Sequence, residues 1–191
     1  MRSVVGVLAL QGDFREHKEA LKRLGVEAKE VRKREHLEGV KALVIPGGES
    51  TTIGKLAREY GIEEEVRRRV AEGSLALFGT CAGAIWLSRE ILGYPEQPRL
   101  GMLDVAVERN AFGRQVESFE EDLEVRGLGP FHGVFIRAPA FRKLGEGVEV
   151  LAELSGLPVL VRQGKMLASA FHPELTADSR IHGYFLQLAG L

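Results

Sequence analysis

The chain of 191 residues has one cysteine, Cys81, so an internal disulfide bond is excluded, as expected in a reducing compartment. Asn110 is the only asparagine, and few asparagines and cysteines are typical of heat-adapted proteins. Long apolar runs are also missing. The amino-terminal run SVVGVLAL is too short to span a bilayer, lacks a cleavage pattern and leads directly into the charged stretch GDFREHKEA. We therefore expect a core strand there and a cytoplasmic protein.

An excess of charge of either sign is lacking as well. Lys and Arg total 26 and Asp and Glu total 27, which gives a net charge of −1. This balance argues against a nucleic-acid partner or an anionic membrane surface. Hydrophobic residues make up 45% and charged residues 28%, the usual mixture of a globular protein. The length, without internal repeats or linkers, predicts a single domain over residues 1–191.

The first half alternates between strand and helix patterns. The runs SVVGVLAL, ALVIP and LALF are apolar throughout, as in strands that are covered on both faces. Asp13 is expected to cap a helix that ends at Gly25, and its apolar stripe comprises Phe14, Ala20, Leu21 and Leu24. Further helices are predicted at about 52–60, 62–71 and 82–91. This order indicates a parallel sheet with helices on both faces.

The second half contains short, partly alternating runs that are separated by Gly and Pro turns. The runs are MLDVAVER, DLEV, GVFIRAP, VEVLAEL, PVLVRQ and MLASAF, and they predict an antiparallel extension or edge strands. Helical spacing returns between residues 176 and 188, with Ile181, Phe185 and Leu188 on one face. The predicted fold class is α/β, with three αβα layers, a mostly parallel central sheet and a small antiparallel extension.

Cys81 lies within GTCAG, directly after the apolar run LALF. A lone cysteine is commonly a small buried hydrophobe. The spacing G-x-C-x-G at a strand-to-helix turn is, however, that of a nucleophile elbow, in which the flanking glycines permit a tight turn. A thiol at a helix amino terminus is favoured as thiolate by the helix dipole. Cys81 is therefore a candidate nucleophile.

A second glycine-rich loop, PGGEST, follows the strand ALVI. Paired glycines allow unusual backbone angles and leave N–H groups available. In a parallel sheet the loops after neighbouring strands meet at one edge. The N–H of Ala82 and an N–H of the PGG loop can then stabilise an oxyanion.

A nucleophilic cysteine needs a base, and the base needs an orienting group. Among five histidines, His17, His36, His132 and His182 are expected to be surface or structural residues. His172 ends an apolar strand in FHPEL, with Glu174 two positions later. Residues two apart in an extended backbone point to the same side, so Glu174 can fix the imidazole tautomer. Taken alone, His-Pro-Glu favours a turn that starts a helix.

Together these motifs closely resemble the class I (triad) glutamine amidotransferases, and within them the branch that supplies ammonia for pyridoxal phosphate synthesis. The resemblance extends over nearly the whole chain, through GVLALQGDFREH, PGGEST, GTCAG, VERNAFGRQVESFE, GVFIRAP and FHPEL. The cysteine elbow and His-x-Glu are shared by many triad glutaminases, whereas RNAFGRQVESFE is particular to this branch. The resemblance implies a flavodoxin-like class I glutaminase fold and no cofactor or metal ion.

The resemblance also implies a role for each site residue. Cys81 would attack the amide carbon of glutamine, His172 would transfer protons and Glu174 would orient His172. The N–H groups of Gly48 and Ala82 would form the oxyanion hole. The residues implied in substrate binding are Gly48, Glu49, Ser50, Arg109, Ile136 and Arg137, and an arginine suits the substrate carboxylate. From the residues alone, solvated charges at strand ends are the favoured interpretation of Arg109 and Arg137.

The implied partner is a barrel-shaped synthase subunit in a large hetero-oligomer, which would use the ammonia to make pyridoxal 5'-phosphate. Three alternatives stay open at this point: a triad glutaminase of another synthase, such as that of the imidazole glycerol phosphate pathway; a redox or chaperone-like α/β protein with a cysteine elbow; and a regulatory subunit without activity. The sequence leaves open what Gln11, Glu16 and His17 do, and QGDFREH is adequately explained as a helix start.

Overall fold

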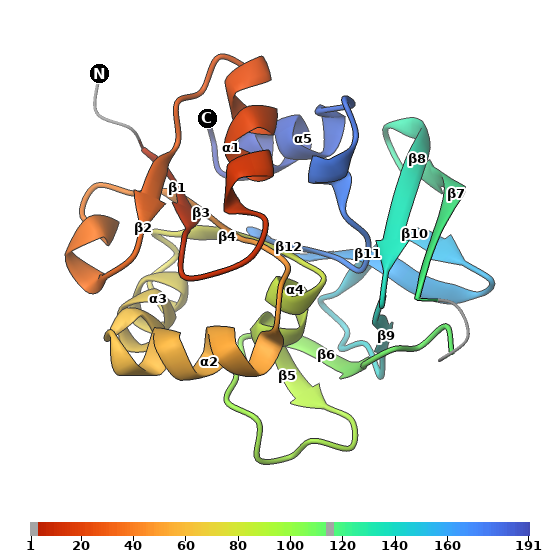
Figure 1. The fold of residues 1–191 in the computed structure, drawn as a ribbon, viewed down its shortest axis with the longest axis horizontal. Coiled ribbons are helices and arrows are strands. Elements are labelled where there is room, and N and C mark those ends of the chain that lie inside the picture. The colour runs from red at the N-terminus through yellow and green to blue at the C-terminus, as the bar shows by residue number, and fades with distance from the viewer. Residues whose placement is uncertain (1–3, 114–116) are drawn as a thin grey trace.

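The computed structural model describes residues 4–113 and 117–191, and a seven-stranded sheet forms its centre (Figure 1). The strand order is β10-β11-β12-β4-β3-β1-β2, and the five strands from β12 to β2 are parallel. β10 and β11 add the antiparallel extension. The bounds are β1 (Val5–Leu8), β2 (Lys29–Val31), β3 (Ala42–Ile45), β4 (Ala76–Thr80), β10 (Glu149–Leu154), β11 (Leu157–Gln163) and β12 (Met166–Ser169).

Helices cover both faces of this sheet, as the alternating pattern predicts. Figure 1 shows α1 and α5 on one face and α2, α3 and α4 on the other. β1, β3 and β4 are buried along their whole length, which explains their uninterrupted apolar runs. The helices are α1 (Phe14–Arg23), α2 (Ser50–Glu59), α3 (Ile62–Ala71), α4 (Ala82–Leu87) and α5 (Arg180–Leu188). Short 3₁₀ turns are η1 (Arg34–Leu37) and η2 (Pro173–Leu175).

Two smaller sheets flank the centre. β5 (Ser88–Ile91), β6 (Leu103–Glu108) and β9 (Ala140–Arg142) form one of them. β7 (Ser118–Val125) and β8 (Gly129–Ile136) form a hairpin beside the carboxyl end of β12. Phe119 and Phe135 stack across this hairpin with ring centroids 4.8 Å apart. Within the described residues, no helix has the length and apolar character that a membrane span requires.

Two predicted helix boundaries are wrong. The helix predicted at 82–91 ends at Leu87, and Ser88–Ile91 instead pairs with β6. The Ser88 hydroxyl donates to the Ala84 carbonyl at 2.8 Å, and strand pairing then overrides helix propensity. At the carboxyl end, α5 begins at Arg180 rather than at Thr176, because Asp178 Oδ1 accepts from the Arg180 N–H in a preceding turn.

Candidate active site

The carboxyl ends of four neighbouring parallel strands, β12, β4, β3 and β1, meet at one edge of the central sheet. The loops that follow them carry the predicted motifs, and an open cavity of about 610 Å³ lies among these loops. Cys81, Ala82 and His172 line this cavity. So do the predicted substrate residues Gly48, Glu49, Ser50, Arg109, Ile136 and Arg137. The fold therefore brings the predicted site residues together.

Cys81 occupies a strained turn between β4 and α4, as the GTCAG spacing predicts. Its φ is 50° and its ψ is −108°, in a region that side chains rarely adopt. A Cβ on Gly79 would lie 2.7 Å from the Gly83 carbonyl carbon, and one on Gly83 would lie 2.0 Å from the Ile45 oxygen. Both glycines are therefore required for the close approach of β4, α4 and β3. The Cys81 Sγ lies 3.6 Å from the Ile136 carbonyl oxygen, to which the thiol can donate.

His172 and Glu174 form the second half of the constellation. His172 Nδ1 lies 2.8 Å from Glu174 Oε2, and both side chains are buried. Burial by itself lowers the pKa of His172, but hydrogen bonds and charge interactions with Cys81 and Glu174 outweigh it and raise the pKa to about 10. Burial raises the pKa of Glu174, and the hydrogen bond from His172 offsets part of this rise. With Nδ1 held by Glu174, Nε2 is the ring nitrogen that remains for another partner.

Asp13 holds the N-cap position of α1, as the sequence predicts, but its side chain does not cap the helix. Its carboxylate makes no capping hydrogen bond and instead lies 3.5 Å from His172 Nδ1, at the wall of the cavity. Asp13, His172 and Glu174 each place one oxygen or nitrogen within 4.8 Å of the others, the spacing of a metal site. Since His172 Nδ1 already bonds to Glu174, we assign these groups to the Cys81 site.

Beneath Glu174 lies a second, fully buried histidine pair, His17 and His182. His17 Nδ1 is 2.8 Å from His182 Nε2, and His17 Nε2 is 3.1 Å from Thr80 Oγ1 and 3.6 Å from Glu174 Oε1. Burial lowers the pKa of both histidines, that of His182 to about 4, so both are neutral near pH 7. His17 is thus a buried residue rather than a surface residue, and it lies near the carboxylate of Glu174.

The PGG loop contacts the loop after β1. The Gly47 carbonyl accepts the Asp13 N–H at 3.4 Å, and a Cβ on Gly12 would lie only 1.7 Å from that carbonyl oxygen. Gly48 has a φ of 149°, and a Cβ there would collide with the Gln11 side chain. Gln11 Oε1 accepts the N–H of Glu49 at 2.8 Å. Gln11, whose role the sequence leaves open, therefore holds the PGG loop.

The Glu49 side chain points to the amino terminus of α2 and not into the cavity, as a substrate contact would need. Its carboxylate caps α2 by accepting the N–H groups of Thr51 and Thr52 at 3.1 and 2.8 Å. Partial burial would raise the pKa of Glu49, but the hydrogen bonds from Thr52 and Thr51 lower it overall. Although Glu49 borders the cavity, its side chain acts as the N-cap.

The two predicted arginines differ in how firmly they are held. Arg109 donates from Nη1 to Gln97 Oε1 at 3.0 Å, and its Cζ lies 4.4 Å from the ring centroid of Tyr94. Arg137 has a φ of 47° and a largely exposed side chain, whose Nη2 is 3.7 Å from Glu117 Oε1. Gln97 and Tyr94 were not predicted, because their loop has no recognisable motif.

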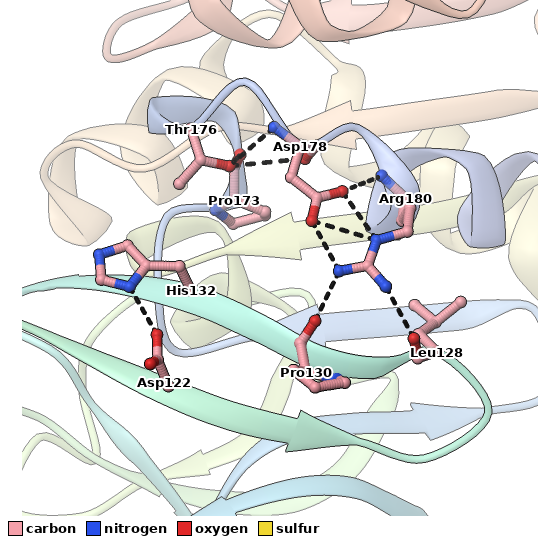
Figure 2. A network of polar contacts seen from close by, with 8 residues as sticks. All are labelled: Asp122, Leu128, Pro130, His132, Pro173, Thr176, Asp178 and Arg180. Atoms are coloured by element: carbon pink, nitrogen blue, oxygen red, sulfur yellow. Dashed lines mark hydrogen bonds and ion pairs between the residues drawn. The ribbon is translucent and has the colours of Figure 1, made fainter.

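Arg180 ties the segment after His172 to the β7–β8 hairpin (Figure 2). It donates to the carbonyls of Leu128 and Pro130 at 2.7 and 2.6 Å, and its other partner is Asp178. The same hairpin ends at Ile136, whose carbonyl faces Cys81. The His172 N–H also donates to the Val134 carbonyl at 2.8 Å, so the segment that carries His172 is bonded directly to β8.

Relatives with high sequence identity cover the whole chain. One is the protein named pyridoxal 5'-phosphate synthase subunit PdxT from Thermus thermophilus, 85% identical over 191 residues and covering all of both chains. Another protein of that name, from Moorella thermoacetica, is 56% identical over 188 residues, covering 97% of this chain and 99% of the relative.

Solved structures with the same fold also match nearly the whole chain. A crystal structure described as a glutamine amidotransferase has a TM-score of 0.97 at 84% identity, covering 98% of this chain and all of that one. The PurLQS structure from Thermotoga maritima has a TM-score of 0.68 at 18% identity, covering all of this chain and 96% of that one, and it shares the fold. The profile of the SNO glutamine amidotransferase family matches residues 7–189. The chain therefore belongs to the SNO glutamine amidotransferase family.

Proposed function

We propose that residues 1–191 act as one glutaminase domain, which hydrolyses L-glutamine to L-glutamate and ammonia for a pyridoxal 5'-phosphate synthase. The observation that carries this proposal is the buried 2.8 Å contact between His172 Nδ1 and Glu174, with Cys81 at a strained elbow on the same cavity. A redox or chaperone-like protein would have no use for this pair. The full-length PdxT relatives favour pyridoxal phosphate synthesis over another synthase.

In this reaction the Cys81 thiol gives its proton to His172, and the sulfur attacks the side-chain amide carbon of glutamine. A tetrahedral intermediate forms, His172 delivers a proton to the leaving nitrogen, and the C–N bond breaks to release ammonia and leave a glutamyl thioester. Water then attacks the thioester while His172 accepts its proton, and cleavage of the C–S bond releases glutamate. Glu174 holds His172 in the required tautomer and stabilises its charged form.

The oxyanion of both tetrahedral intermediates needs backbone donors. Ala82 is the first residue of α4, so its N–H has no partner within the helix and is available to the oxyanion. The N–H of Gly48 is the second proposed donor. Arg109 and Ser50 receive the α-carboxylate of glutamine, while Ile136 and Arg137 form the opposite wall.

The partner is a synthase subunit, and we propose that it is barrel-shaped and assembles with this chain into a hetero-oligomer. Ammonia becomes ammonium in neutral water and loses its nucleophilicity, so it must reach an acceptor site that is sheltered from solvent. Hydrolysis without an acceptor would waste glutamine. We therefore expect docking to complete the oxyanion hole by turning a peptide of the PGG loop, where glycines allow the change at low steric cost.

The test is glutamine hydrolysis at saturating glutamine by the purified chain, with and without the synthase subunit from the same source. Low activity alone and a large rise on addition of the partner are expected. Equal rates in both conditions would contradict activation by docking. Absence of hydrolysis in both conditions would contradict the glutaminase itself, and absence of a complex in sedimentation would contradict the partner.

A further inference from the structure

The loop between β5 and β6 holds a glutamine that contacts two of the proposed substrate residues. Gln97 is 8% exposed, and its Nε2 is 2.7 Å from Ser50 Oγ while its Oε1 is 3.0 Å from Arg109 Nη1. Ser50 and Arg109 both line the cavity. We propose that Gln97, supported by Tyr94, is a positioning residue that prepares Ser50 and Arg109 to bind the α-carboxylate of the substrate. This inference rests on the proposed function.

The chemistry of the neighbours fixes which way the Gln97 amide points. A guanidinium group only donates hydrogen bonds, so the amide atom that faces Arg109 has to be the oxygen. The nitrogen of Gln97 then faces Ser50 Oγ, which has to accept. Because the Ser50 oxygen accepts from Gln97, its own hydrogen is left for an acceptor in the cavity. A serine that is 3% exposed is thereby set as a donor before any substrate arrives.

Arg109 is prepared by two different contacts. Gln97 takes one N–H at Nη1, and the ring of Tyr94 lies 4.4 Å from Cζ, so a cation–π contact covers one face of the guanidinium. Among the residues that the structure describes, no other hydrogen bond or ion pair takes the remaining N–H groups of the fork, which a ligand can use. A positive fork beside a hydroxyl donor suits a carboxylate, and the α-carboxylate is the only anionic group of glutamine. Holding both donors beforehand reduces the entropy lost on binding.

Gln97→Ala removes the contacts to both Ser50 and Arg109, whereas Gln97→Glu removes the hydrogen bond to Ser50 and keeps the one from Arg109. A glutamate at this position still accepts from Arg109 but cannot donate to Ser50, whose hydroxyl would turn toward the new carboxylate. The new negative charge would also compete with the substrate for Arg109. We expect the KM for glutamine to rise about 10-fold in Gln97→Ala and further in Gln97→Glu, with kcat within about 2-fold, as one lost charge-assisted contact implies.

Selective labelling of Cys81 gives a readout that a general loss of structure would not produce. The chain, with the synthase subunit present, is treated with 6-diazo-5-oxo-L-norleucine, which carries the α-carboxylate, or with iodoacetamide, which lacks it. Since Cys81 is the only cysteine, mass spectrometry follows both reactions directly. Gln97→Ala should slow labelling by the first reagent about 10-fold and leave the second within about 2-fold.

Tyr94 and Gln187 provide matched controls. Tyr94→Phe keeps the ring and should behave like the wild type, whereas Tyr94→Ala should slow the diazo reagent alone. Gln187 lies exposed on α5, and Gln187→Ala should change neither reaction. If Gln97→Ala slows both reagents equally, or neither, the positioning role is wrong. If the wild type itself hydrolyses no glutamine and reacts with no diazo reagent, the proposed function fails instead.

Discussion

His17 Nε2 lies 3.6 Å from Glu174 Oε1, while Glu174 Oε2 bonds to His172 Nδ1 at 2.8 Å. The carboxylate of Glu174 therefore lies between two imidazoles of opposite character. His172 borders the cavity and its pKa is raised to about 10, whereas His17 is fully buried and its pKa is lowered by burial. Because His17 is neutral, the negative charge of Glu174 interacts mainly with the imidazole of His172.

Cys81→Ala should abolish glutaminase activity, because no other group on the chain can form the thioester. The fold and binding of the synthase subunit should persist, since the substitution removes a single sulfur atom. Activity is measured by glutamate release, and binding by sedimentation of the mixture. Retention of most of the turnover by the alanine variant would disprove the covalent mechanism.

His172→Ala should approach the loss that Cys81→Ala causes, because members of one catalytic unit fail together. Glu174→Ala should lower kcat by about 10²-fold or more, and less than His172→Ala, because water partly replaces an orienting carboxylate. Both variants are compared at saturating glutamine with the synthase subunit present. A residue whose alanine variant keeps wild-type turnover has no part in the mechanism.

The buried histidine pair should make the protein less stable in acid. The pKa of His182 falls from the ordinary 6.5 to about 4 in the folded chain, and that of His17 is lowered as well. Below pH 6.5 the unfolded chain therefore binds protons that the folded chain does not, and the free energy of unfolding decreases as the pH falls toward 4. Urea unfolding at several pH values measures this slope.

His182→Gln is the variant that isolates this effect. Its amide can still donate to His17 Nδ1 but does not titrate, so the slope between pH 6.5 and 4.5 should be shallower than in the wild type. His132 serves as an internal reference in an NMR titration. Hydrogen bonds from Asp122 and Glu120 raise its pKa, so it should titrate above 6.5 while His182 titrates near 4. An unchanged slope would show that the buried pair does not control acid stability.

Arg180→Ala should loosen the connection between the β7–β8 hairpin and the turn that carries His172 (Figure 2). Loss of its bonds to the Leu128 and Pro130 carbonyls should lower the free energy of unfolding by more than the loss of one exposed ion pair does. Amide hydrogen exchange should quicken near the hairpin tip. Arg142→Ala, which removes an exposed ion pair with Glu108, is the control and should cost about 0.5 kcal/mol or less.

Local patterns sufficed to predict the nucleophile elbow and the His-x-Glu pair. Both depend on spacings of two residues, which backbone geometry translates directly into position. The contacts of Asp13 and the burial of His17 depend instead on segments far apart in sequence. His17 and His182 are separated by 165 positions, and no periodicity of α1 or α5 indicates that their side chains meet. The sequence therefore predicted the elbow and the His172–Glu174 pair more fully than the contacts of Asp13 and His17.

Three predictions that were wrong, or that were missed, also concern contacts between segments far apart in sequence. Asp13 has the residue type and position of a helix cap, yet its carboxylate lies nearer to an imidazole from another loop. The helix after Cys81 stops at Leu87 because β6 offers Ser88–Ile91 a strand partner. Gln97 was missed because it belongs to no sequence motif. Its contacts to Ser50 and Arg109 join three segments that come together only in the folded chain.

The collision between a Cβ on Gly12 and the Gly47 carbonyl has an evolutionary consequence. Two loops from the neighbouring strands β1 and β3 share one small volume, and a side chain at position 12 would displace the Gly47 carbonyl. Position 12 is thus expected to stay glycine among descendants of this chain as long as the Gly47 carbonyl keeps its place. A lineage that acquired a side chain at position 12 would need a rebuilt PGG loop.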